Sequence, residues 1–372
     1  YSSAASDVYK RQAPAFDPAL AARLQTLLDA AVADGTIPGA VLSVSLPGGA
    51  TWTGASGLAD RDAGTAMTLE TRVRIGSLSK LFTAVMALQL AQEGAIELDR
   101  PVATWLPGLL PAGDTITVRH LLQHTSGLYD YLENRDFLAL AYQRPDYTWL
   151  PAELAGYAGQ RGFLFKPGSP GAWDYSSTNF VILGMVVEAV TGNTLAQEMR
   201  ARIFEPLGLD ATYFVPDEGV EGVYARGYRN ASDVSAVSLS FAYATANIVA
   251  TSGDVASFGE ALFGGELLDQ AMLTQMRTFV GGKGQYDMPE LQYGLGLMAN
   301  QLPVGPSPDG RERAPDDSRV LGHIGGINGF RSALWYAPDR EALIVLSVNQ
   351  GASNPNELAT AVLDTLLAAQ GR

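Results

Sequence analysis

A serine and a lysine stand three residues apart at the start of a long apolar run, in the order Gly76-Ser77-Leu78-Ser79-Lys80. The residues before Gly76 favour a strand, and those from 81 to 88 favour a buried helix, so Ser77 is expected near a helix N-terminus. Positions i and i+3 share one face of a helix, which brings Ser77 and Lys80 together. A serine hydroxyl becomes a nucleophile when a base lies within hydrogen-bond reach, and a deprotonated lysine amine is such a base. The unpaired N–H groups at a helix start can also stabilise an oxyanion.

A second motif that could do chemistry is Tyr175-Ser176-Ser177, just before an apolar segment from 179 to 190 that favours a buried helix. A phenol beside Ser77 could accept its proton, or pass one to a leaving group, if a cation such as Lys80 lowers the phenol pKa from about 10. The residues alone leave open which of Lys80 and Tyr175 is the base. An aromatic residue that packs at a helix entry is the simpler alternative for this motif.

The third motif is His323-Ile324-Gly325-Gly326, on an expected strand. Glycines in a strand let another backbone approach closely, as a substrate lying along the strand edge would. The N–H group of Gly326 could then join that of Ser77 in an oxyanion hole. A glycine-rich bend in a strand is the alternative interpretation.

Together the three motifs resemble those of the penicillin-interacting serine enzymes, which combine Ser-x-x-Lys with two elements further along the chain. The sequence is similar to the branch with Tyr-x-Asn and His-x-Gly elements, which includes class C β-lactamases, Streptomyces-type D-alanyl-D-alanine carboxypeptidases, D-aminopeptidases and related esterases. The resemblance covers about residues 20–368 and extends to four further segments, at 121–128, 166–168, 179–184 and 204–209.

The resemblance implies a role for each of these residues. Ser77 is expected to be the acylated nucleophile, Lys80 its activating partner, and Tyr175 the general base and later the acid. His323 is expected near the leaving group, and the N–H groups of Ser77 and Gly326 are expected to form the oxyanion hole. An activity optimum well above neutral pH fits a lysine and tyrosine pair.

Two positions depart from the family pattern. Ser177 stands where the family usually has an asparagine that holds substrate, and Ile324 stands where penicillin-active members usually have a threonine that contacts the substrate carboxylate. Ser177 and Gly325 are nevertheless counted with Gly326 among the expected substrate-binding residues. Because both changes remove polar contacts, selectivity should weaken, and we expect ester cleavage to be favoured over β-lactam hydrolysis. A D-amino-acid peptide is the leading substrate class, with a small ester as the alternative.

The elements that position the motifs form an α+β pattern. Strands are expected at 40–46, 51–55, 293–297, 330–336 and 342–348, and helices at 20–31, 118–123, 179–190, 195–204, 252–263, 270–279 and 356–369. Strands at both ends and helices between them predict one antiparallel sheet flanked by helices, with an inserted helical subdomain, as in the β-lactamase/transpeptidase-like fold. We expect one catalytic domain over 13–372, with an α/β part at 13–76 and 290–372 and a helical part at 77–289. Residues 1–12 are interpreted as a non-native or disordered segment.

Composition narrows the possible functions. The chain has 372 residues, 47% of them apolar, and no cysteine, which excludes disulfides, thiolate zinc sites and cysteine nucleophiles. Its net charge of −14 argues against a nucleic-acid partner. No stretch approaches the about 20 apolar residues that a membrane span needs. We expect a small-molecule or peptide substrate and no cofactor, and we leave the oligomeric state open. The compartment also stays open: the family resemblance implies a periplasmic or secreted protein, whereas the sequence carries no signal peptide.

Other functional classes have less support. His120 and His124 have a spacing that can bind zinc, but no third histidine or following glutamate accompanies them, so we expect no metal. The glycines at 281–284 and 294–296 lack a nucleotide-binding fingerprint, and no Gly-x-Ser-x-Gly motif indicates an α/β-hydrolase. A binding protein of the same fold that no longer turns over substrate is the alternative of another class, and burst kinetics without steady turnover would reveal it.

Overall fold

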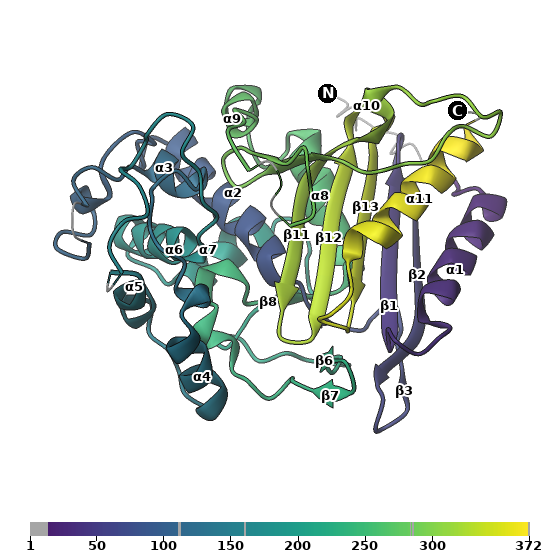
Figure 1. Cartoon of the computed structure of the whole chain (residues 1–372), viewed down its shortest axis with the longest axis horizontal. Coiled ribbons are helices and arrows are strands. Elements are labelled where there is room, and N and C mark those ends of the chain that lie inside the picture. Colours follow the sequence, from purple (N-terminus) through teal and green to yellow (C-terminus); the bar gives the residue numbers. More distant parts are fainter. Residues whose placement is uncertain (1–13, 111–112, 160, 283, 285, 371–372) are drawn as a thin grey trace, which may run out of the picture.

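A large antiparallel sheet forms one half of the protein, as the computed structural model shows for residues 14–110, 113–159, 161–282, 284 and 286–370 (Figure 1). Among these residues the sheet has eight strands in the order β3-β2-β1-β13-β12-β11-β10-β9. Its strands are β1 (Gly39–Leu46), β2 (Ala50–Asp60), β3 (Thr65–Ala66), β9 (Gln292–Tyr293), β10 (Met298–Gln301), β11 (Arg319–Ile327), β12 (Phe330–Ala337) and β13 (Ala342–Val348). The expected α+β class, with strands from both ends of the chain in one sheet, is confirmed. The segment 1–12 lies outside the described residues.

Helices cover both faces of this sheet. Helices α1 (Pro18–Val32) and α11 (Pro355–Ala369) pack against each other and against β1, β2, β12 and β13, whereas α8 (Ser252–Gly264) packs on β1, β12 and β13 from the other face (Figure 1). The Asp17 side chain accepts hydrogen bonds from the first N–H groups of α1, and a proline follows it, which fixes the start of that helix. The sheet is therefore buried between two helical layers.

The remaining helices lie mostly beside the sheet, toward the left of Figure 1. They are α2 (Ser79–Gln92), α3 (Val118–Leu122), α4 (Arg135–Gln143), α5 (Pro151–Gly159), α6 (Ser177–Thr191), α7 (Leu195–Met199), α9 (Gln270–Met276) and α10 (Pro315–Ser318). Two small sheets accompany them, one of β4 (Val73–Arg74), β5 (Tyr213–Phe214) and β8 (Ile248–Ala250), the other of β6 (Tyr228–Arg229) and β7 (Ser232–Asp233). The division of the chain into an α/β part and a helical part at the expected boundaries stays a prediction.

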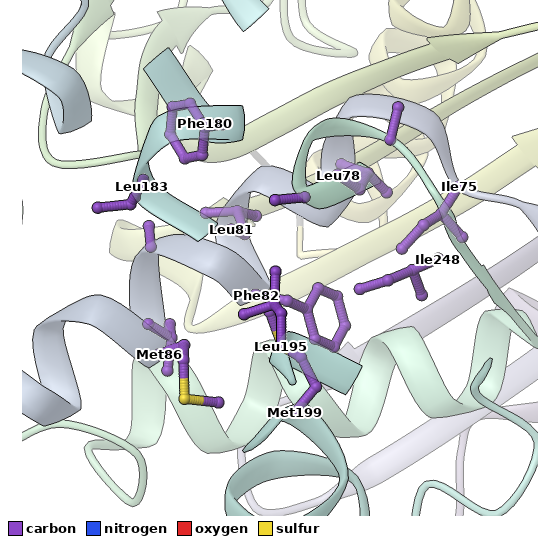
Figure 2. Close-up of a cluster of buried hydrophobic side chains, with 14 of the residues drawn as sticks. Ile75, Leu78, Leu81, Phe82, Met86, Phe180, Leu183, Leu195, Met199 and Ile248 are labelled. Carbon is purple, nitrogen blue, oxygen red and sulfur yellow. The ribbon is translucent and has the colours of Figure 1, made fainter. Parts of the chain in front are cut away.

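Helix α2 is the central helix of the hydrophobic core, because every residue from Ser79 to Leu88 is buried. Phe82 stacks on Phe258 of α8, with ring centroids 3.6 Å apart, and Leu81 and Met86 lie in the same cluster as Phe180 of α6 (Figure 2). A helix that is apolar on all sides has to be buried on all sides. Its first turn, with Lys80, is consequently fixed from several directions.

One expected strand is wrong. Only Tyr293 of this segment lies in a strand, as the last residue of β9. Residues 294–297 form a turn between β9 and β10, in which the N–H of Gly294 donates to the carbonyl of Leu297 at 2.7 Å. Gly296 has a φ of +76°, and a Cβ at this position would overlap that of Ala84 in α2. The alternating pattern of 293–297 therefore reflects a tight turn packed on α2, in which glycine is required by both conformation and space.

Helix boundaries elsewhere agree within a few residues. The helix expected over 195–204 is an α-helix to Met199 and continues as a wider π-helical turn over Arg200–Phe204. In the described part of the chain, no single helix is long and apolar enough to cross a bilayer. Only α6 together with 195–204 reaches that length and composition, and the two are joined at an 81° bend.

Candidate active site

Ser77 and Lys80 meet at the turn that enters α2. Ser77 lies in a 3₁₀ turn, Gly76–Leu78, that follows β4, and Lys80 is the second residue of α2. The amine Nζ of Lys80 lies 3.1 Å from Oγ of Ser77 and 3.2 Å from the carbonyl oxygen of Thr245. Ser77 is half-buried and borders a cavity, whereas Lys80 behind it has no exposed surface. The two side chains meet as their spacing predicts, although Ser77 lies in the turn before α2 and not on the helix itself.

The surroundings of Lys80 lower the pKa of its amine toward neutral pH. Burial lowers the pKa of Lys80 from 10.5 to about 7, and the nearby Asp130 carboxylate opposes that shift. The amine also lies 5.0 Å from the ring centroid of Tyr175 and 5.8 Å from that of Phe180. With a pKa of about 7, a large share of Lys80 is neutral at pH 7 and able to accept a proton from Ser77.

Tyr175 reaches the same serine from the segment before α6. Its phenol hydrogen-bonds Ser77, yet burial and the neighbouring phenols of Tyr293 and Tyr286 raise the pKa of Tyr175 well above 10. The segment is fixed by buried His124, whose Nδ1 accepts the N–H of Ser176 at 3.1 Å and whose ring lies 4.3 Å from that of Tyr175. Tyr175 therefore stays protonated at neutral pH, and the order of the two pKa values favours Lys80 as the base.

His323 lies on β11 at the same cavity and is neutral. Its Nδ1 donates to the carbonyl of Ile324, and its Nε2 accepts the hydroxyl of Tyr293 at 2.9 Å. Burial, followed by the nearby Lys80 amine, lowers the pKa of His323 to about 3. A histidine with this pKa holds no transferable positive charge at pH 7. Because Nε2 carries no hydrogen in this tautomer, the Tyr293 hydroxyl donates its hydrogen to the His323 ring.

The glycines of the third motif bring β11 against the nucleophile turn. Strand β10 pairs only with residues 319–322, so the edge of β11 from His323 onward is left to that turn. A Cβ at Gly325 would overlap the carbonyl oxygen of Ile75, and a Cβ at Gly76 would lie 2.7 Å from the N atom of Gly326. The close backbone approach expected at these glycines is therefore made by the nucleophile turn itself. Assignment of the oxyanion hole to the N–H groups of Ser77 and Gly326 stays a prediction.

These residues surround a cavity of about 430 Å³ between the sheet and the helical elements. All the predicted site residues except the buried Lys80 line it: Ser77, Tyr175, Ser177, His323, Gly325 and Gly326. Three charged side chains also border it, the carboxylates of Asp130 and Asp287 and the guanidinium of Arg331. Side chains of opposite charge therefore border one small cavity beside Ser77.

Sequence reasoning missed Asp130, Tyr293 and Arg331. Asp130 is buried, and its carboxylate accepts the N–H groups of Ser177 and Leu132 and the hydroxyl of Ser177. Burial raises the pKa of Asp130, and these hydrogen bonds and Lys80 oppose the rise. An acid two residues after Leu128, just beyond the segment 121–128 that carries the resemblance, was the available signal. Arg331 gave no signal, because a single arginine on a strand is usually a surface residue.

The two spaced histidines serve different purposes. Nδ1 of His120 accepts the N–H of Thr117 at the start of α3, whereas Nδ1 of His124 fixes the Tyr175 segment. Across the residues that the structure describes, no group of three or more histidine, aspartate or glutamate side chains is placed to hold a metal ion. Lys283, within the glycine-rich segment 281–284, lies outside those residues.

The site combines a buried lysine beside a serine at a helix start, a phenol hydrogen-bonded to that serine, and a glycine-containing strand alongside. This combination is typical of serine hydrolases that act through an acyl-enzyme. Residues 24–369 match the beta-lactamase family, and the chain belongs to that family. Esterase EstB of Burkholderia gladioli is 36% identical over 215 residues, which are 54% of this chain and 53% of the esterase. The chain spans about half of the length of the curated relatives that it matches first.

Solved structures agree with this placement over nearly the whole chain. A D-stereospecific amidohydrolase from a Streptomyces species is 36% identical, with a TM-score of 0.76 over 91% of this chain and 96% of that one. The D-amino acid amidase of Ochrobactrum anthropi SV3, solved with L-phenylalanine, is 29% identical, with a TM-score of 0.82 over 95% of this chain and 99% of that one. The expected family and fold are thereby confirmed, as is membership of a family of serine hydrolases.

Proposed function

We propose that this protein hydrolyses amides of D-amino acids, or short peptides that begin with one, through an acyl-enzyme on Ser77. The observation that carries the proposal is the pairing of Ser77 with a buried Lys80 whose pKa is about 7, beside a cavity bordered by the Asp130 carboxylate. The preference for D-amino acids is supported by the names of the two structural relatives, a D-stereospecific amidohydrolase and a D-amino acid amidase.

The proposed chemistry uses each side chain in its favoured protonation state. Neutral Lys80 takes the proton of the Ser77 hydroxyl as Oγ forms a bond to the amide carbon. The protonated Tyr175 phenol then gives its proton to the leaving nitrogen as the carbon–nitrogen bond breaks, and it regains one from Lys80. Water attacks the ester in the second half, with its proton passed by the same route, and Ser77 is restored. Tyr293 and His323 remain neutral partners beside the leaving group.

Asp130 explains why the acyl group should carry an ammonium group. Its carboxylate borders the cavity beside Ser177 and is held by three hydrogen bonds from the protein. A carboxylate oxygen accepts further hydrogen bonds, and a charged donor binds it more strongly than a neutral one. The α-ammonium of an amino acid amide is one bond from the carbon next to the scissile carbonyl, so a substrate whose carbonyl meets Ser77 would carry its charge inside the cavity that Asp130 borders.

A matched pair of substrates tests this assignment. D-Phenylalaninamide should be hydrolysed faster than L-phenylalaninamide, and faster than 3-phenylpropionamide, which lacks the amine. The variant Asp130→Asn keeps an oxygen acceptor and should raise KM for D-phenylalaninamide about tenfold or more, because a charged hydrogen bond is lost. Turnover of p-nitrophenyl acetate, which has no amine, should change little. Equal losses on all substrates would mean that Asp130 only supports the fold.

The pH dependence of ester turnover should report the Lys80 amine. Because the neutral amine is the base, kcat/KM for p-nitrophenyl acetate should rise with pH and reach half of its maximum near pH 7, the pKa of about 7 that burial gives Lys80. The rate should therefore be greatest above neutral pH, as the sequence also predicts. Stopped-flow measurements between pH 5 and 9, with an ester that does not titrate, would measure it. A flat profile would exclude Lys80 as the base.

A small ester is the second candidate substrate, and the likeness to esterase EstB favours it. Esters need less assistance to expel their leaving group than amides do, so the same site could act on both. The comparison of D-phenylalaninamide with D-phenylalanine methyl ester separates the two candidates. Rapid ester cleavage with no detectable amide cleavage would identify an esterase. An acyl-enzyme that forms but never turns over would identify a binding protein.

A further inference from the structure

Arg331 lies beside the proposed oxyanion hole, on the strand next to β11. It is paired across the sheet with Gly326, and a Cβ on residue 326 would overlap Nη1 of the arginine. The guanidinium therefore occupies the space above the glycine backbone, and it borders the same cavity as Ser77. Glycine at 326 is what lets the arginine side chain lie flat on β11 next to the nucleophile.

This cation is half-buried and has no counter-ion among the residues that the structure describes. Its Nε donates to the carbonyl of Gly351 at 2.9 Å, and no carboxylate of the described chain lies within ion-pair distance of it. The nearby Arg229 has the same charge and therefore does not neutralise Arg331. A charge withdrawn from water without a partner is unfavourable, so an anion that enters the cavity gains a strong interaction there.

We propose that Arg331 binds a carboxylate on the leaving group, so that the preferred substrates are dipeptides with a free C-terminus. The proposal rests on the proposed function, in which the acyl side of the scissile bond is directed toward Asp130. Asp130 borders the cavity beside Ser177, whereas Arg331 borders it beside Gly326 and Gly351. A zwitterionic dipeptide matches this division of charge, with its ammonium at one wall and its carboxylate at the other. A planar guanidinium presents two parallel N–H donors to a carboxylate, which suits this role.

The sharpest test uses acetyl esters that differ only in leaving-group charge, because it does not depend on a D-amino acid substrate. The wild-type protein should have a higher kcat/KM for 4-acetoxybenzoate than for its uncharged methyl ester. In Arg331→Gln this preference should fall about tenfold to a hundredfold. The fall should come from a lower kcat/KM for 4-acetoxybenzoate, with kcat/KM for the methyl ester unchanged. Arg229→Gln is the matched control, because Arg229 lies close to Arg331 but is exposed and does not border the cavity; it should keep the preference. An unchanged preference in Arg331→Gln would overturn the proposal.

Two further measurements separate this proposal from the proposed function. D-Phe-Gly should be cleaved more efficiently than D-Phe-Gly amide, and Arg331→Gln should remove the difference. If D-phenylalaninamide and both dipeptides are left uncleaved but the ester preference still depends on Arg331, the carboxylate site stands and the D-amide function fails. If D-amides are cleaved and the preference for the charged ester is the same in Arg331→Gln as in the wild type, the proposed function stands and the proposed carboxylate site is wrong. Should Arg331→Gln fail to fold, 4-hydroxybenzoate should still inhibit the wild-type protein competitively and more strongly than its methyl ester; equal inhibition would contradict the proposal.

Discussion

Ser77→Ala should leave the protein folded and unable to form any covalent adduct. The side chain is half-buried at the cavity wall, and its removal deletes a hydroxyl that bonds only other site residues, Lys80 and Tyr175. Acylation needs that oxygen, so the loss should be complete within detection rather than partial. Intact mass after brief incubation with p-nitrophenyl acetate should show one acetyl group on the wild-type protein and none on the variant.

The matched control for this experiment is Ser169→Ala. Ser169 is, like Ser77, a half-buried serine, but it lies outside the cavity, and its hydroxyl donates only to the carbonyl of Lys166. It should acylate like the wild type. An acetyl group that persists on Ser77→Ala would assign the nucleophile to another residue and overturn the mechanism. A parallel incubation with benzylpenicillin extends the result: a stable adduct that needs Ser77 would show that β-lactams still enter the site.

Lys80→Met should lower the acylation rate by about 10²–10⁴, the usual effect of removing a general base. Methionine approximates the length of the lysine stem and suits a buried position, so the site should keep its shape. Lys80→Arg should fail to rescue the rate, because a guanidinium does not lose its proton at the pH of the assay. Stopped-flow acylation by p-nitrophenyl acetate measures both variants. A variant that retains more than a tenth of the rate would make Tyr175 the better candidate for the base.

The same substitution should stabilise the fold, which a merely structural lysine would not do. Burial lowers the pKa of Lys80 from 10.5 to about 7, so at pH 7 the unfolded chain binds a proton that about half of the folded chains lack. At about 1.4 kcal/mol per pKa unit, this difference destabilises the native state by on the order of 4 kcal/mol at pH 7. Methionine removes that cost, partly offset by the lost hydrogen bond to Thr245.

The sign of the pH dependence distinguishes this explanation from better packing. The stability gained by Lys80→Met should be largest at and below pH 7 and should disappear as the pH rises toward 10.5, where lysine is neutral in both states. Denaturant unfolding of the wild type and the variant at pH 7 and pH 10 measures it. A gain that is equal at both pH values would mean that Lys80 has an ordinary pKa in the folded protein.

The local sequence was sufficient for the nucleophile and its base. Ser77 and Lys80 stand three positions apart at a helix start, and an apolar run that must be buried fixes the helix that begins between them. Local spacing determines their geometry, because helical periodicity acts over one turn. The three motifs and their order were likewise sufficient to predict the family, which the match over residues 24–369 confirms.

Sequence reasoning failed where the geometry depends on contacts between distant segments. Residues 293–297 alternate like a strand, yet Gly296 turns against Ala84 of α2, about two hundred residues earlier in the chain. The order of the pKa values of Lys80 and Tyr175 could not be predicted either. It arises from burial by several elements and from the phenols of Tyr286 and Tyr293.

The sequence by itself therefore determined the class of chemistry, through side chains spaced within a single helical turn and three ordered motifs. Only the tertiary structure decided the protonation states and the charges that border the cavity. Asp130 reaches the site from the loop after α3, and Arg331 reaches it from β12 over Gly326. Electrostatic effects of this kind depend on three-dimensional distance and on the exclusion of water, and neither is encoded in the spacing of residues along the chain.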